Sequence, residues 1–291
     1  MNHIIDVNNL SKSFGSNTVL IDLSFKIEEG SVVGILGANG AGKTTLLQCL
    51  IGMLKSDVGD ITILGDKCPN FSVNTKHNIG YVGQEADLLN WMKVNQIIDY
   101  TKQFYNHWND DMVEQLLEDW DLSKQQKISK LSVGQRQKLA IILAVAPQPK
   151  ILILDEPVAS LDPTTRRKFI KTLIDMNLDN GQTILFSTHI TSDLERVAAE
   201  VLLLKQGRCF FQGDIDDLKE QVVRLHISSK RPIDAQLPIT GILTADINGQ
   251  HASITVKNVK DINIDQLAEE IDADITIESL SLEDIFVELH S

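Results

Sequence analysis

The chain has 291 residues, of which 43% are hydrophobic, and its 27 basic and 40 acidic side chains give a formal net charge of −13. The apolar fraction supports a packed core and excludes global disorder, and the acidic balance argues against nucleic acid or anionic lipid as a partner. The longest apolar run, residues 139–147, is far shorter than the about 20 residues that cross a bilayer.

Short apolar runs alternate with helical patterns over residues 1–213. We expect strands at 32–36, 61–64, 79–82, 151–154, 183–187 and 201–204. We expect helices at 43–52, 94–108, 112–120, 134–146, 164–177 and 192–199. This alternation predicts an α/β domain whose sheet is covered on both faces.

The composition changes after Gly213. Residues 214–291 hold 16 acidic and 6 basic side chains, so this segment carries a net charge of −10. Its pattern predicts strands at 222–228, 242–246, 252–257 and 274–277, and helices at 264–271 and 282–289. We therefore expect a small C-terminal α+β domain at 214–291. Its expected role is to buttress a dimer, with a regulatory ligand site as the alternative.

A phosphate-binding loop lies between the first expected strand and the first expected helix. It matches the pattern GxxxxGK[ST] and reads Gly37-Ala38-Asn39-Gly40-Ala41-Gly42-Lys43-Thr44. Its glycines let successive backbone N–H groups turn toward phosphate oxygens, and the following helix adds the positive end of its dipole. Lys43 supplies a cation for the outer phosphates, and Thr44 supplies a hydroxyl for Mg²⁺. The plainer alternative is a glycine-rich turn.

Two carboxylates follow the apolar run at 151–154. Ligands of open α/β sheets bind beyond the carboxyl ends of the strands, so we expect Asp155 and Glu156 to lie beside the phosphate loop. Asp155 is the natural partner of Mg²⁺, through water, and Glu156 is placed to polarise a water that attacks the γ-phosphate. A lone Asp-Glu pair at a strand end is more often a solvated turn, but the phosphate loop favours the functional interpretation.

Further motifs occur in a fixed order along residues 4–213. Residues 131–135 read Leu-Ser-Val-Gly-Gln and resemble the LSGGQ signature of ATP-binding cassette (ABC) ATPases, with Val133 in place of the first glycine. Four other features resemble elements of the same family, namely the Q-loop glutamine, the D-loop, the switch histidine and the aromatic residue at adenine: Gln84, Ala159-Ser160-Leu161-Asp162, His189 and Phe14. We interpret residues 1–213 as a P-loop NTPase ABC cassette.

The resemblance implies a site shared between two chains. Residues 37–45, from Gly37 to Thr45, would bind ATP from one side. Thr44, Gln84 and Asp155 would bind Mg²⁺. Gln84, Glu156 and His189 would serve hydrolysis, and Phe14 would stack on adenine. Ser132, Gly134 and Gln135 of a second cassette would close the site, in a homodimer or a heterodimer. A single histidine after a strand is usually structural, and a lone aromatic residue is often part of a core.

The segment between the Q-loop and the signature resembles the helical subdomain of ABC cassettes, which we place at about 85–146. It holds all three tryptophans, Trp91, Trp108 and Trp120. In this family the subdomain receives a helix of the membrane subunit, and we expect residues 85–91 to line the docking groove. Alternatively, these aromatic residues pack a small helical core. We favour this alternative for most of them, and Trp91 is the exception.

The closing stretch at 281–289 resembles the end of cassettes from ABC-2 type exporters of drugs, peptides and polysaccharides. The resemblance implies a separate transmembrane permease as partner and export of a drug, peptide or lipid-like compound. An importer cassette and a regulatory ABC ATPase without transport are the alternatives.

Three isolated cysteines fit reduced thiols, and residues 1–6 do not resemble a secretory signal. We therefore expect a cytoplasmic protein, peripheral on the inner face of the membrane.

Overall fold

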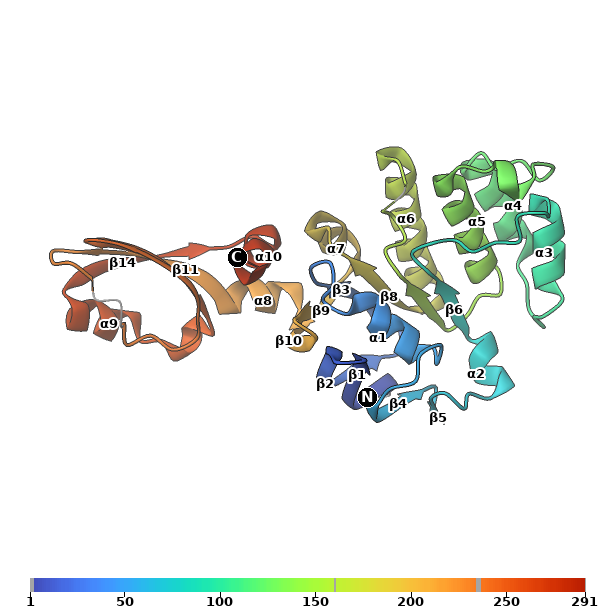
Figure 1. The fold of residues 1–291 in the computed structure, drawn as a ribbon. Helices are drawn as coiled ribbons and strands as arrows, with labels where there is room; N and C mark the ends of the chain where they lie inside the picture. The colour runs from blue at the N-terminus through green and yellow to red at the C-terminus, as the bar shows by residue number, and fades with distance from the viewer. Residues whose placement is uncertain (1–2, 160, 234–236, 291) are drawn as a thin grey trace. The chain divides into compact units, whose positions relative to one another are not determined.

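The computed structural model describes residues 3–159, 161–233 and 237–290 (Figure 1). Ser160, one residue of the expected D-loop, lies outside the described residues. The chain divides into two compact units, Met1–Gln212 and Gly213–Ser291. Each unit is described by itself.

The central sheet of the first unit has the strand order β10-β9-β3-β8-β7-β6. Its strands are β3 (Val32–Leu36), β6 (Ile79–Val82), β7 (Ile151–Leu154), β8 (Thr183–Thr188), β9 (Glu200–Lys205) and β10 (Arg208–Asp214). The pairs β3–β8, β3–β9, β7–β8 and β6–β7 are parallel. The carboxyl ends of β3, β6, β7 and β8 therefore meet at one edge of the sheet, where ligands of such sheets bind.

A second, antiparallel sheet has the order β2-β1-β4-β5. It is formed by β1 (His3–Phe14), β2 (Asn17–Glu28), β4 (Val58–Ile63) and β5 (Asp66–Lys67). The sequence analysis predicted only part of β4 and missed β1, β2 and β5. The register of β1 against β2 shifts at several points, one of them between Val7 and Leu10. Such irregularities break the period of two on which strand prediction depends.

The helices of the first unit are α1 (Lys43–Leu50), α2 (Val73–His77), α3 (Val94–Lys102), α4 (Asp110–Asp119), α5 (Val133–Val145), α6 (Pro163–Asn180) and α7 (Thr191–Val197), with a 3₁₀ turn at Ile128–Lys130. The helix expected at 94–108 ends at Lys102. A new helix begins instead after Asn109, whose Oδ1 accepts a hydrogen bond from the Met112 N–H. This N-cap satisfies a first-turn donor of α4 and fixes its start. No helix among the described residues is long and apolar enough to span a membrane.

The hydrophobic core of the first unit joins its two sheets through α1. Leu46, Leu47 and Leu50 of α1 are fully buried in one cluster with Ile35 of β3 and Ile5 of β1. The helix that follows the phosphate loop is therefore packed against both sheets. This packing holds its N-terminus in place at the carboxyl edge of β3.

The second unit is a four-stranded antiparallel sheet in the order β12-β13-β11-β14. Its elements are α8 (Ile215–Gln221), β11 (Val222–Ser229), β12 (Ile242–Asn248), β13 (His251–Lys257), a 3₁₀ turn (Val259–Asp261), α9 (Ile264–Ile271), β14 (Ala273–Ser279) and α10 (Leu282–His290). Leu267 of α9 packs with Leu225 and Ile254 on one face of the sheet. The strands and helices expected at 222–289 are present, with bounds that differ by at most two residues; α8 was not predicted.

Candidate functional site

The phosphate loop connects β3 to α1 and requires glycine at two points. Gly42 has a φ of +102°, and a Cβ atom there would lie 2.7 Å from a methyl group of Leu20. A Cβ atom on Gly37 would lie 2.9 Å from the carbonyl oxygen of Leu204. At Gly37 the close atom belongs to the backbone of β9, so a side chain there would displace that strand. At Gly42 a side chain would be strained by the left-handed backbone conformation and would have to push the Leu20 side chain aside. The backbone of the loop is therefore fixed by the packing around it.

Lys43, the first residue of α1, lies folded back under this loop. Its ammonium donates hydrogen bonds of 2.7 Å to the Gly37 carbonyl and 3.2 Å to the Ala38 carbonyl. The side chain is only 5% exposed, and Nζ lies 3.5 Å from Oε1 of Glu156. A sequestered cation of this kind is weakly screened by solvent. It brings positive charge to the boundary between the loop and the carboxylates that follow β7.

Asp155 and Glu156 follow β7, as predicted. Asp155 is fully buried, and its Oδ1 accepts a hydrogen bond of 2.6 Å from the Ser187 hydroxyl of β8. Its Oδ2 is buried and has no hydrogen-bond partner among the described residues. Burial raises the pKa of the nearby Tyr81 hydroxyl, and the negative charge of Asp155 raises it further. The unpaired oxygen is an acceptor that a cation can satisfy.

Glu156 adopts a backbone conformation that is uncommon for a residue with a side chain. Its φ is +45°, and its N–H donates a 2.8 Å hydrogen bond to the Ser187 hydroxyl. His189, which follows β8, places Nδ1 3.1 Å from Oε2 of Glu156. A left-handed conformation at a non-glycine residue costs free energy and is concentrated at functional sites. Here it directs the carboxylate between Lys43 and His189.

These side chains surround one hollow of about 480 Å³. Its lining consists of residues from the phosphate loop, β2 and the carboxyl edge of the sheet: Asn17, Val19, Asn39, Gly40, Gly42, Lys43, Thr44, Thr45, Gln84, Glu156 and His189. A second hollow of about 700 Å³ shares Thr44 and Gln84 and also reaches Asp155. The sequence analysis missed Asn17 and Val19, because β2 was not predicted. Gly37, Ala38 and Ala41 are loop residues outside this lining.

Phe14 does not line the hollow. Its ring is 49% exposed, and Nζ of Lys12 lies 5.5 Å from the ring centroid. Phe14 pairs with Asn17 at the turn between β1 and β2. The ring therefore lies on the same hairpin as Asn17 and Val19, which do line the hollow.

The signature-like segment begins α5. Ser132 is the N-cap: its Oγ accepts a 3.2 Å hydrogen bond from the Gln135 N–H, and its own N–H donates a 3.0 Å bond to the Gln135 side chain. Ser132 is exposed, and Val133 is 66% exposed. This reciprocal capping box fixes the start of the helix. Residues 131–135 are all described, and none of them lines the hollow around Lys43.

Comparison with known proteins identifies the family. A family model for the ABC transporter matches residues 20–159. The "Phosphonates import ATP-binding protein PhnC 2" of Pseudomonas syringae is 32% identical over 243 residues, which span 76% of this chain and 88% of that protein. The chain belongs to the ABC transporter ATP-binding proteins. An uncharacterized ABC transporter ATP-binding protein of Bacillus subtilis, YxlF, is 32% identical over 75% of this chain and 73% of its own length.

The fold of this ABC protein also occurs in solved structures. A dimeric cassette, MJ0796, in a post-hydrolysis state bound to ADP and Pi, matches with a TM-score of 0.66 and 24% identity over 72% of this chain and 98% of that chain. The predicted ABC cassette fold and the prediction of a nucleotide-binding P-loop ATPase are confirmed. Membership does not fix the direction of transport, because PhnC 2 is named an importer.

The donors around the phosphate loop of this ABC protein fit Mg²⁺. The buried Oδ2 of Asp155 has no hydrogen-bond partner among the described residues, and Thr44 and Gln84 line the adjoining hollow. A carboxylate, a hydroxyl and an amide are hard oxygen donors of the kind that Mg²⁺ takes together with phosphate oxygens. The described residues hold no cluster of three or more His, Cys, Asp or Glu side chains suited to a metal by themselves.

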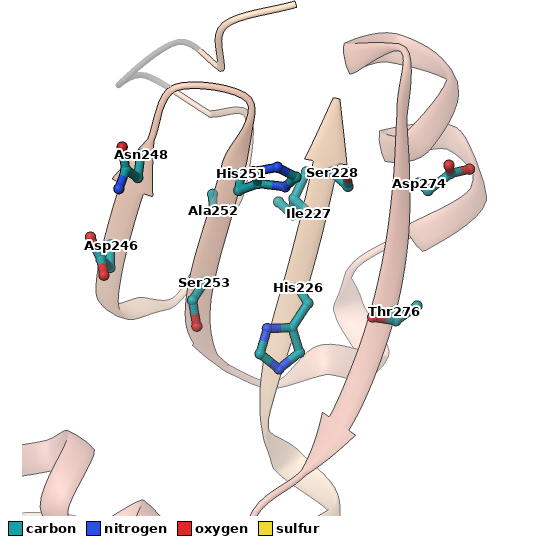
Figure 2. A pocket seen from close by; sticks show the side chains of 10 residues that line it. All are labelled: His226, Ile227, Ser228, Asp246, Asn248, His251, Ala252, Ser253, Asp274 and Thr276. Atoms are coloured by element: carbon teal, nitrogen blue, oxygen red, sulfur yellow. The ribbon is translucent and has the colours of Figure 1, made fainter. Parts of the chain in front are cut away.

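The C-terminal unit of the ABC protein has a separate hollow of about 320 Å³ on the polar face of its sheet (Figure 2). His226 and Ser228 of β11 lie at its centre with His251 of β13. Its two carboxylates, Asp246 and Asp274, lie on the edge strands β12 and β14. Three strand spacings of ~5 Å separate these edges, so the carboxylates do not converge on one small ligand.

Proposed function

We propose that this ABC protein is the ATP-hydrolysing subunit of a transporter, and that its site lies in the hollow around Lys43. The observation that carries the proposal is the convergence of two groups, a lysine ammonium and a histidine imidazole, on one carboxylate. Glu156 places one oxygen 3.5 Å from Lys43 Nζ and the other 3.1 Å from His189 Nδ1. A carboxylate held in this way is suited to polarise a water beside phosphates that bind at the loop.

Each group has a distinct task in this proposal. Backbone N–H groups of residues 37–42 and the N-terminus of α1 bind the phosphates, and Thr45 adjoins them. Lys43 neutralises the outer phosphates. Glu156 accepts the proton of the attacking water. His189 orients the Glu156 carboxylate and contacts the γ-phosphate, and Gln84 lies beside these two residues. Thr44, Gln84 and Asp155 would hold Mg²⁺, which supplies positive charge to the phosphate oxygens. Phe14 stacks on adenine from the hairpin that carries Asn17.

The proposed working state is a dimer of two cassettes. The chain holds one phosphate loop and one signature-like segment, and residues 131–135 do not line the hollow of their own chain. The exposed N-terminus of α5, at Ser132, Gly134 and Gln135, offers backbone donors and a positive dipole end to a γ-phosphate of the second cassette. The dimeric MJ0796 structure supports this arrangement. The second cassette is an identical copy or a related chain.

We further propose that a separate membrane permease docks at the segment after Gln84. Residues 85–88 line the hollow of about 700 Å³ that also reaches Thr44. Trp91 lies outside that hollow, but its side chain is 72% exposed. An exposed tryptophan beside a groove is a typical anchor of protein interfaces. Docking there would hold the protein on the inner face of the membrane.

The proposed direction of transport is export of a drug, peptide or lipid-like compound. It is supported by the closing stretch, now seen as α10, which resembles the end of ABC-2 type exporter cassettes. An importer is the second candidate, because the relative PhnC 2 is named an importer. A regulatory ATPase without transport is the third, and it would need no permease.

The test is to purify the tagged chain from membranes with its bound membrane protein and to reconstitute the complex in vesicles with the cassettes outside. Export predicts that ATP drives an amphipathic dye into the vesicle lumen, and that the permease stimulates ATP hydrolysis. ATP hydrolysis that never responds to any membrane protein would favour the regulatory candidate. Transport that needs an added substrate-binding protein would favour import.

A further inference from the structure

An ion pair joins two helices that begin beside the proposed site. Arg166, one turn into α6, donates a hydrogen bond from its guanidinium to Oδ2 of Asp193 in the first turn of α7. Asp193 is only 3% exposed. The Nε atom of Arg166 is also buried and has no hydrogen-bond partner among the described residues. The Arg166 side chain is 24% exposed, so the pair is shielded mainly on the Asp193 side, where removal of Arg166 would leave a buried carboxylate without its charged partner.

One side of this pair leads to His189. The backbone N–H of Asp193 donates a 3.3 Å hydrogen bond to the Ile190 carbonyl, and the Ile190 N–H donates a 3.0 Å bond to the Thr188 hydroxyl at the end of β8. His189 lies between these two bonded residues and places Nδ1 3.1 Å from Glu156. A shift of Asp193 would therefore move the backbone that carries the imidazole.

The other side of the pair leads to the loop at 159–162. Asp162 caps α6: its Oδ1 accepts from the N–H groups of Thr164 and Thr165, and its Oδ2 accepts from the Thr165 hydroxyl at 2.6 Å. These hydrogen bonds, first of all that from the Thr165 hydroxyl, lower the pKa of Asp162. The charged cap ties the end of the loop to the first turn of α6, in which Arg166 follows.

The loop in turn connects back to Glu156. The Ala159 N–H donates a 3.2 Å hydrogen bond to the Glu156 carbonyl, and the Leu161 N–H donates a 3.1 Å bond to the Val158 carbonyl. The contacts thus form a closed ring from Glu156 through the loop, α6, the ion pair and α7 to His189, which again contacts Glu156. Two side-chain contacts close this ring across the fold, the Arg166–Asp193 pair and the His189–Glu156 contact.

We propose that Arg166 and Asp193 are positioning residues that couple the loop at 159–162 to the alignment of His189 on Glu156. The inference rests on the proposed function of Glu156 and His189. Because the ion pair makes α6 and α7 move together, a displacement of Ala159, Leu161 or Asp162 in this loop is transmitted to the imidazole. Hydrolysis then depends on the position of the loop, while the binding of ATP at the phosphate loop does not.

The test is a double-mutant cycle on the full chain, with Arg166→Gln, Asp193→Asn and the double variant. We expect each single variant to lower kcat by about tenfold and to change the affinity of the monomer for a fluorescent ATP analogue by less than about twofold. The kcat of the double variant should be no lower than that of either single variant. Arg166→Lys keeps the charge and should recover part of kcat. Arg167→Gln, which removes an exposed charge one residue along the same helix, is the matched control and should leave kcat unchanged.

The outcomes separate this inference from the proposed function. Thermal melting of every variant shows whether it is folded at the assay temperature. If folded Arg166→Gln hydrolyses ATP at the normal rate, or if the losses of the two single variants add, the coupling is overturned. If Glu156→Gln and His189→Ala also hydrolyse ATP at the normal rate, the proposed function fails as well. Normal Arg166→Gln beside inactive Glu156→Gln overturns only the coupling.

Discussion

His189 and Glu156 contact each other across the carboxyl ends of two neighbouring parallel strands, with Nδ1 and Oε2 3.1 Å apart. The two strands, β7 and β8, pair in register from Ile151 with Thr183 to Leu154 with Phe186. Each residue follows its strand by a short distance, so the parallel pairing brings an acid and an imidazole together although they lie 33 positions apart in the sequence.

Glu156→Gln should keep ATP binding and lose hydrolysis. The amide occupies the same volume but cannot accept the proton of the attacking water, which should cost about 10²–10⁴-fold in kcat. Because ATP persists, the variant should form a stable dimer on addition of ATP and Mg²⁺. Steady-state ATPase assays and gel filtration test both parts. A monomer under all conditions would contradict the shared site.

Lys43→Ala should abolish hydrolysis and also loosen the phosphate loop. The substitution removes the cation from the phosphates and leaves the Gly37 and Ala38 carbonyls without the hydrogen bonds that the ammonium donates. The loss of two partly buried hydrogen bonds should lower the free energy of unfolding by about 1–3 kcal/mol. Calorimetry and ATPase assays measure the two effects. Lys55→Ala, at an exposed position, is the control and should be normal in both.

Ser132→Arg should block closure of the dimer and spare ATP binding to each monomer. The residue is exposed at the start of α5, where a long cationic side chain would occupy the space proposed for the nucleotide of the second cassette. The substitution also removes an N-cap, which should cost about 1 kcal/mol. Ser132→Ala separates the effects, because it removes the cap without the bulk. If Ser132→Arg turns over ATP with normal cooperativity, the signature does not cap the partner's ATP.

Trp91→Ala should weaken binding to the permease without affecting the fold. The side chain is 72% exposed, so its removal should change the free energy of unfolding by no more than about 0.5 kcal/mol. Truncation of an aromatic anchor should cost about 2 kcal/mol or more in binding. Co-purification with the membrane protein measures the loss, and ATP hydrolysis by the cassette alone is the control. Unchanged binding and transport would remove Trp91 from the docking surface.

Arg224→Met should remove a pH-dependent part of the stability of the C-terminal unit. Arg224 contacts Glu278 at 3.0 Å and Glu288 at 2.6 Å. The pKa of Glu278 is lowered by hydrogen bonds from His226 and Arg224, and that of Glu288 by those from Thr244 and Arg224. Carboxylates with lowered folded-state pKa values contribute stability above their unfolded pKa of about 4.3 and lose it as the pH falls through the folded pKa.

The variant should therefore melt below the wild type at pH 7, and the difference should shrink as the pH falls below about 4. Circular dichroism reports the unfolding of both units. Tryptophan fluorescence reports only the first unit, because all three tryptophans lie between residues 91 and 120. Arg231→Met, at an exposed position, is the matched control. A difference in melting temperature that stays constant with pH would contradict this assignment.

The sequence by itself determined the buried strands and the phosphate loop. The bounds of β3, β6 and β7 agree with the prediction. The central strands β3 and β7 are largely buried on both faces and appear as continuous apolar runs, whereas β6 is a short, half-buried strand at the edge of the sheet. The strand β1 escaped prediction, since register shifts break the alternation that marks a half-buried strand. The strand β2 was missed although its residues 23–28 alternate between buried and exposed. The phosphate loop could be recognised from its own residues, because its glycines, lysine and threonine lie within eight consecutive positions. The close contacts of Gly37 with Leu204 and of Gly42 with Leu20 come from the tertiary structure.

Only the tertiary structure decided which side chains meet. Asn17 and Val19 enter the hollow through the packing of an antiparallel sheet against α1, which no local pattern indicates. The pairing of Arg166 with Asp193 joins residues that lie 27 positions apart on different helices. Propensity and periodicity describe neighbours along the chain, whereas a buried ion pair depends on how two elements pack. For that reason the loop was predictable from its residues, and the ring that connects Glu156 to His189 through two helices was not.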